Sequence, residues 1–168
     1  VTIEDGAKEV NISSGTIKGE VNVETGAEEK ITISGGAFSD DVSDYLDGNK
    51  AVIKNEDGSY EVVAGLIKIA DKYYGTVKDA LDAVGNGQTI EILEAAAGDE
   101  SKTEIDFTKH INFTITGKAP NHALPVITFQ NATVNIKDAH ILIPELDARQ
   151  NATINVINSK VDDAGGNS

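Results

Sequence analysis

The sequence contains no cysteine and no methionine. Without cysteine the chain can form no disulfide framework, no thiolate metal site and no catalytic thiol. Because methionine is absent and the first residue is Val1, we expect an excised or processed piece of a longer protein. No run of about 18 apolar residues occurs, and the first residues lack the basic and apolar regions of a signal peptide. We therefore expect no membrane insertion.

Positive charge is also scarce, since 14 Lys and Arg residues stand against 28 Asp and Glu residues, for a net charge of −14. A charge of this sign repels phosphate backbones and anionic membrane surfaces. We therefore expect no nucleic-acid partner. A solvated acidic surface that keeps the protein soluble is the simpler interpretation of the charge, and affinity for a divalent cation such as Ca²⁺ is the alternative.

What the chain does contain is a repeat. Asn131 begins the stretch NATVNIKDAHI, and Asn151 begins the near copy NATINVINSKV, 20 residues later. Apolar positions keep their character, as in Val134 with Ile154. Short β-branched runs that recur at a fixed period predict a solenoid, in which each coil buries its apolar face only against its neighbours. The first 40 residues repeat similarly, with Val10 meeting Ile31. We predict an all-β fold, a right-handed parallel β-helix with coils of about 20–22 residues, short capping helices and a β-hairpin.

Two interruptions divide this pattern. After Phe38, the sequence SDDVSDYLDGN predicts a short helix that begins at Ser39 and covers the last coil, and KAVIKNEDGSYEVV then predicts the hairpin. From Thr76, an amphipathic pattern predicts a helix whose N-cap is Thr76, supported by Asp79. We predict two domains: residues 1–64 are the C-terminal coils of one β-helical unit with its cap and hairpin, and residues 65–168 are the cap helix and first coils of a second.

Two segments between Ile31 and Leu93 carry a resemblance to known families. The phrase ISGGAFSDDVSDYLDGNKAVIKNEDGSYEVV resembles β-helical repeat modules of large adhesin-like surface proteins from gut-dwelling Firmicutes and related bacteria. The phrase YYGTVKDALDAVGNGQTIEIL resembles the helix-plus-strand cap of pectin-lyase-like right-handed β-helices. The resemblance implies an extracellular protein of the cell wall or cell surface. Its partners would be neighbouring β-helical units of the same array and a glycan or a host or microbial surface ligand.

The preferred function is therefore a non-enzymatic, adhesin-like module that acts as a stalk or binds a glycan or host ligand. One alternative is a polysaccharide lyase or hydrolase, because β-helical lyases use carboxylates for Ca²⁺ and a basic residue as proton acceptor. The single arginine, Arg149, lies near Glu145 and Asp147 in the sequence, with Asp138, Asp162 and Asp163 expected on neighbouring coils. A further alternative is a self-associating structural protein whose last coil pairs with another chain.

Candidate ligand-binding residues follow from their chemistry. Tyr73 and Tyr74 can stack on a sugar, with packing between units as the alternative. The stretch KAPNHALP is expected to be a loop that its prolines hold out of the strand ladders, presenting Asn121 and His122. Arg149 completes this set.

Three aspartates are candidates for a surface cation site, with capping of a helix as the alternative. They are Asp40, Asp41 and Asp44. No other cofactor is expected. Asn131 and Asn151 are expected to stack one above the other, because they lie one coil apart.

Overall fold

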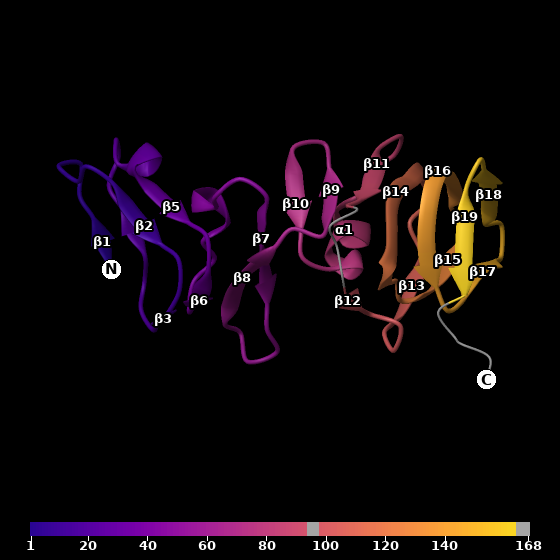
Figure 1. Ribbon diagram of the computed structural model, residues 1–168, viewed down its shortest axis with the longest axis horizontal. Coiled ribbons are helices and arrows are strands. Elements are labelled where there is room, and N and C mark those ends of the chain that lie inside the picture. The colour runs from indigo at the N-terminus through magenta and orange to yellow at the C-terminus, as the bar shows by residue number, and fades with distance from the viewer. Residues whose placement is uncertain (94–97, 164–168) are drawn as a thin grey trace. The chain divides into compact units, whose positions relative to one another are not determined.

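The computed structural model describes residues 1–93 and 98–163 and shows a parallel β-solenoid of about seven turns (Figure 1). The predicted all-β, parallel β-helical fold is confirmed. The chain forms two compact units. Unit 1 comprises Val1–Gly65 and Tyr73–Gly75, and unit 2 comprises Leu66–Lys72 and the described residues from Thr76 onward.

The first two coils of unit 1 are built from short strands. The first coil contains β1 (Thr2–Ile3), β2 (Val10–Ile12) and β3 (Thr16–Ile17), and the second contains β4 (Asn22–Val23), β5 (Ile31–Ile33) and β6 (Gly36–Phe38). A 3₁₀ turn, η1 (Glu28–Lys30), precedes β5. Each strand pairs in parallel with its counterpart in the next coil, as Val10 does with Ile31. The register predicted from the repeat is therefore correct.

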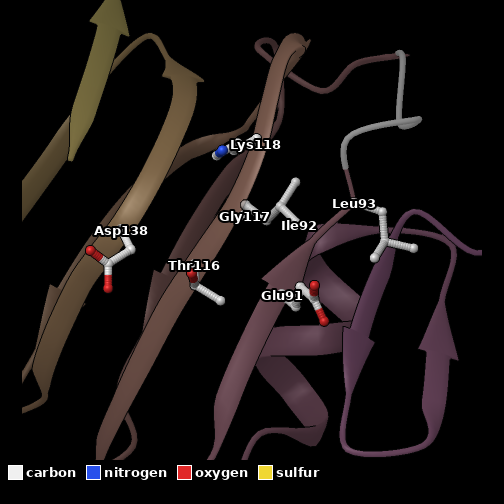
Figure 2. Close-up of a pocket in the computed structure, with 7 residues that line it drawn as sticks. All are labelled: Glu91, Ile92, Leu93, Thr116, Gly117, Lys118 and Asp138. Carbon is white, nitrogen blue, oxygen red and sulfur yellow. The ribbon is translucent and has the colours of Figure 1, made fainter. Parts of the chain in front are cut away.

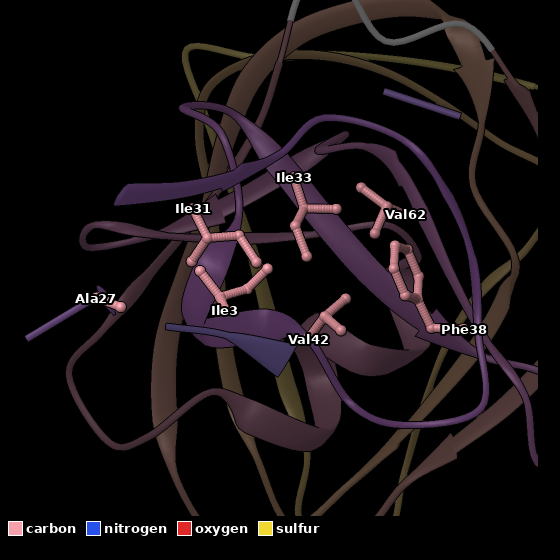
Figure 3. Close-up of a cluster of buried hydrophobic side chains, with 7 residues drawn as sticks. All are labelled: Ile3, Ala27, Ile31, Ile33, Phe38, Val42 and Val62. Carbon is pink, nitrogen blue, oxygen red and sulfur yellow. The ribbon is translucent and has the colours of Figure 1, made fainter. Parts of the chain in front are cut away.

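The core of unit 1 lies inside these coils. Ile31 and Ile33 are buried while Thr32 between them is only half-buried, because successive side chains of a strand point to opposite faces. Figure 3 shows the buried cluster that they form with Ile3, Ala27, Phe38, Val42 and Val62.

The cover of the second coil differs from the prediction. No α-helix begins at Ser39; its backbone N–H instead bonds to the carbonyl oxygen of Ile17 at 3.1 Å and extends the ladder. A short 3₁₀ turn, η2 (Ser43–Tyr45), follows, and the Asp41 carboxylate accepts a hydrogen bond from the N–H of Ser43 at 2.9 Å. The helix prediction was wrong because aspartate side chains bond locally to the backbone and so compete with a helix.

The predicted hairpin is confirmed. Strands β7 (Lys50–Lys54) and β8 (Tyr60–Ala64) pair antiparallel, and β8 also pairs antiparallel with β6. The turn is closed by a 2.8 Å hydrogen bond from the N–H of Asn55 to the carbonyl of Ser59. Gly58 provides the positive φ of 86° that this turn needs. The short strand β10 (Lys72–Tyr74) belongs to unit 1 except for its first residue, Lys72, which belongs to unit 2.

Unit 2 opens with β9 (Ile67–Ile69), helix α1 (Val77–Ala83) and β11 (Thr89–Ile92). The Thr76 hydroxyl accepts a hydrogen bond from the N–H of Asp79 at 3.1 Å, so the predicted N-cap is confirmed. At the other end, the Lys109 ammonium donates to the carbonyl oxygens of Leu81 and Val84, at 3.1 Å each. Side chains thus satisfy free backbone groups at both ends of this seven-residue helix.

The coils of unit 2 form two parallel stacks of strands. In one sheet, β11, β14 (Asn112–Ala123), β16 (Thr133–Ile143) and β18 (Thr153–Ile157) lie side by side (Figure 1), with β12 (Gly98–Asp99) on β14 and β19 (Lys160–Asp163) on β16. The other sheet contains β13 (Glu104–Phe107), β15 (Val126–Gln130) and β17 (Leu146–Arg149). The antiparallel partner of β11 is β9.

Stacked aromatic residues fill this unit. Phe107 pairs in register with Phe129, as predicted, and the centroids of their rings lie 5.6 Å apart. Phe113 joins them, with ring centroids 5.2 Å from Phe107 and 5.9 Å from Phe129. Tilted and edge-on pairs of this kind add to the stability that burial alone provides.

One corner of each coil in unit 2 requires a positive φ. Asp138 (φ 51°) and Asn158 (φ 47°) occupy equivalent positions in successive coils, and Gly117 (φ 118°) pairs with Ala139, the residue after Asp138. Glycine, aspartate and asparagine are the residues that adopt such angles most readily. At Gly117 the backbone also comes close to β11, because an added Cβ would lie 1.9 Å from the carbonyl oxygen of Ile92.

Candidate ligand-binding surface

The predicted loop around Asn121 and His122 is part of strand β14. Lys118 and Ala119 pair with His140 and Ile141, and the ladder resumes at Ala123 after a bulge. The prediction that this stretch stays outside the ladders was wrong. Pro120 lies within the bulge, where its missing N–H costs no ladder hydrogen bond.

His122 has a structural role. Its side chain is only 1% exposed, so a ligand on the surface cannot reach it. Its Nε2 lies 3.0 Å from a carboxylate oxygen of Glu100, and that carboxylate also accepts a hydrogen bond from the N–H of Val77 at 3.2 Å. Glu100 therefore ties the first residue of α1 to β14. Asn121, the neighbouring candidate, is exposed.

Among the described residues, Arg149 forms an ion pair with Asp147 but with none of the other acidic residues predicted near it. Its Nε donates to the Asp147 carboxylate at 2.7 Å, and this hydrogen bond is the main cause that raises the pKa of Arg149. Asp138 lies in the other sheet and accepts a hydrogen bond from Asn158 at 2.6 Å. Asp162 also lies in that sheet. The constellation predicted for a lyase is thus divided between two sheets.

The two tyrosine candidates lie in β10 and are half-buried. Burial raises the pKa of the Tyr74 hydroxyl. Tyr73 packs so closely on Gly65 that a Cβ added to the glycine would lie 2.7 Å from the Tyr73 Cβ. This packing favours the structural alternative for Tyr73.

The three aspartates proposed for a cation have mixed surroundings. Asp41 accepts the Ser43 N–H, and one carboxylate oxygen of Asp40 is buried with no hydrogen-bond partner among the described residues. Within residues 1–93 and 98–163, no group of three or more His, Asp or Glu side chains is arranged to hold a metal ion. A Ca²⁺ site at Asp40, Asp41 and Asp44 remains a prediction.

Unit 2 carries a surface cavity of about 290 Å³. Figure 2 shows its lining, which comes from β11, the residue after it, and the strands β14 and β16: Glu91, Ile92, Leu93, Thr116, Gly117, Lys118 and Asp138. The cavity lies beside the corner at Gly117, where the ladder between β14 and β16 shifts its register. Its volume is close to the lower limit of about 300 Å³ for small-molecule sites, which suits one small polar ligand.

The groups in this cavity match a ligand rich in hydroxyl groups. The carboxylates of Glu91 and Asp138 accept hydrogen bonds, Thr116 both donates and accepts, and Lys118 donates. The half-buried Leu93 adds some apolar surface, whereas the Ile92 side chain is buried in the core. A few polar groups beside apolar surface are typical of small-molecule sites.

Hydrogen bonds between polar side chains link neighbouring coils of unit 2. Asn155 donates to Asn135 at 3.0 Å, and Asn151 donates to Asn131 at 3.4 Å. The predicted stacking of Asn131 and Asn151 is confirmed. Within the lining of the cavity, the bond from Asn158 to Asp138 holds the Asp138 carboxylate in place in the same way.

A row of basic residues also crosses this sheet. Lys118 pairs in register with His140, and His140 pairs with Lys160. The Asp162 carboxylate lies 2.8 Å from the His140 Nε2 and 2.7 Å from the Lys160 Nζ. The hydrogen bond from Lys160, and then that from His140, lowers the pKa of Asp162. In the sequence, Lys118 and His140 are 22 residues apart and His140 and Lys160 are 20 residues apart, close to the period of the coils. The bulge in β14 makes this alignment hard to recognise from the sequence.

Among the described helices, none is long and apolar enough to cross a membrane. Comparisons of the chain with family models, curated proteins and solved structures gave no match.

Proposed function

We propose that the chain is a non-enzymatic, adhesin-like module of a bacterial cell surface, and that its second unit binds a glycan. The observation that supports this proposal is the cavity between β11, β14 and β16, with its carboxylates, hydroxyl and ammonium beside the half-buried Leu93. Neutral sugars offer many hydroxyl groups that both donate and accept, and the acceptors Glu91 and Asp138 suit them.

The binding is expected to be weak. A cavity of about 290 Å³ holds about one sugar ring, and a single small contact of this kind gives a Kd of about 1 mM, or about −4 kcal/mol. An array of such units, as the resemblance of the sequence implies, would raise the apparent affinity through multivalency. A stalk built from the same units would serve that array by spacing the sites.

Self-association is a second candidate because of one observation. Val156 and Ile157 in β18 are 54% and 46% exposed, although their register partners belong to the strand β16 whose Ile136 is fully buried. A further β-coil that stacks on β18 would cover them. That coil would come from a neighbouring unit or from a second copy, and light scattering over a range of concentrations distinguishes a dimerising chain from a monomer. The lyase alternative gains no such support, because Arg149 lies in a different sheet from Asp138 and Asp162.

Binding of the immobilised protein to a broad panel of glycans tests the proposal. Thr116→Val keeps the shape of the side chain and removes one hydroxyl from the cavity, and Thr114→Val makes the same change on β14 outside the lining. We expect reproducible binding to one class of glycan that falls with Thr116→Val and persists with Thr114→Val. Binding that is unchanged in Thr116→Val would contradict the cavity as the site. If no glycan of the panel binds, the function as a stalk is the better proposal.

A further inference from the structure

The basic row Lys118, His140 and Lys160 is unusual in a chain of net charge −14. Neighbouring strands of a sheet lie about 4.8 Å apart, so residues in register hold their side chains close together. Like charges directly opposite each other in a sheet destabilise it. The two ammonium groups on either side of the imidazole would stabilise an anion placed beside this row.

Asp162 supplies that anion for only half of the row. One oxygen of its carboxylate bridges His140 and Lys160, at 2.8 Å and 2.7 Å. Lys118 forms no ion pair with any carboxylate in the described part of the chain. Its side chain is exposed, and it lines the cavity proposed for the glycan. Among the described residues, no carboxylate bridges Lys118 and His140 as Asp162 bridges His140 and Lys160.

We propose that the glycan carries an anionic ester, a sulfate or phosphate monoester, whose oxygens bind Lys118 at the edge of the cavity and extend toward His140. This inference rests on the proposed function. A tetrahedral ester has three terminal oxygens, enough to meet donors from two adjacent strands, and its charge-assisted hydrogen bonds are the stronger kind. The sugar ring remains over Thr116 and the carboxylates of the cavity.

The net charge of the chain further limits which anionic glycans can bind. A net charge of −14 repels a polyanion over the whole surface, whereas one ester group meets mainly the local field of the basic row. The ligand is therefore a glycan with an isolated ester rather than a densely charged chain. Because Lys118 is exposed, its contribution falls as the ionic strength rises.

Isothermal titration of the full chain with single sugars tests this inference. The probes are glucose 6-sulfate, glucose 6-phosphate, glucuronate and glucose, at low ionic strength. We expect at least one ester to bind about tenfold more tightly than glucose, which is the gain expected of one or two charge-assisted hydrogen bonds. Lys118→Gln should remove this gain. Lys8→Gln, which makes the same change of charge at an exposed position of unit 1, should preserve it.

The different sugars identify the ester, and together with the glycan panel they distinguish failure of the ester inference from failure of the proposed function. A gain for only one ester names the group that the site takes. Esters that bind no better than glucose, a gain that survives Lys118→Gln, or glucuronate binding as tightly as the esters would each overturn the inference. If a neutral glycan of the panel still binds through Thr116, the proposed function stands without the ester, and if nothing binds, both fail.

Discussion

Gly117→Ala should destabilise unit 2 more than Gly85→Ala or Gly87→Ala. Gly117 has a φ of 118°, and an added Cβ would lie 1.9 Å from the carbonyl oxygen of Ile92 and 2.8 Å from its N. An L-residue held at such an angle costs about 1–3 kcal/mol. Forcing an extra carbon against the backbone of the adjacent strand costs about 1–3 kcal/mol more. The expected loss in the free energy of unfolding is therefore about 2–6 kcal/mol.

Urea denaturation, followed by circular dichroism in the strand region, measures this loss. The matched control is Gly87→Ala, because Gly87 also has a positive φ, 78°, but no atom within 4 Å of an added Cβ. The control should lose only about 1–2 kcal/mol. Equal losses for the two variants would contradict this prediction. They would show that the backbone of β11 does not lie as close to Gly117 as it does in the structure.

Three further changes probe the core, a cap and a surface ion pair. Phe129→Ala should lower the free energy of unfolding by about 3–5 kcal/mol, since Phe129 is fully buried against two other rings, and urea denaturation measures it. Thr76→Ala should cost about 1 kcal/mol in the same assay through loss of the bond to the Asp79 N–H, and Thr76→Ser should restore most of it. The pKa of Asp162, lowered first by Lys160, should rise in Lys160→Gln when its carboxyl carbon is titrated by NMR, and an unchanged pKa would contradict the pairing. Because the folded pKa is the lower one, the stabilisation is complete above the ordinary aspartate pKa of about 3.9 and is lost as the pH falls through the folded value.

The register of the coils could be predicted from the sequence because it depends on a repeated pattern. Phe107 with Phe129 and Val134 with Ile154 follow directly from the period, since stacked coils place equivalent residues in contact. The N-cap at Thr76 was also predictable, because it depends on a bond between residues three apart.

The bulge in β14 and the burial of His122 could not be predicted in this way. Both prolines and the polar residues between them favour a loop, and only the tertiary contact with Glu100 satisfies the buried imidazole Nε2. The helix predicted after Phe38 fails partly for a related reason: besides the local bond of Asp41, the N–H of Ser39 bonds to Ile17 in a neighbouring coil.

The candidate site was missed for the same reason. Lys118 was assigned to a loop, so its alignment with His140 and Lys160 was not apparent, although all three lie one coil apart. The cavity itself depends on Gly117 and on a register shift that no local pattern specifies.

The binding of a sugar in the cavity of unit 2 is the central proposal. Mapping of amide chemical shifts in the ¹⁵N-labelled chain, titrated with glucose 6-sulfate, tests it most directly. We expect the largest shifts to cluster at Thr116, Gly117, Lys118 and Asp138, with smaller ones at His140. Shifts that cluster elsewhere in the chain, or no shifts up to a concentration of about 10 mM, well above the expected Kd, would contradict it.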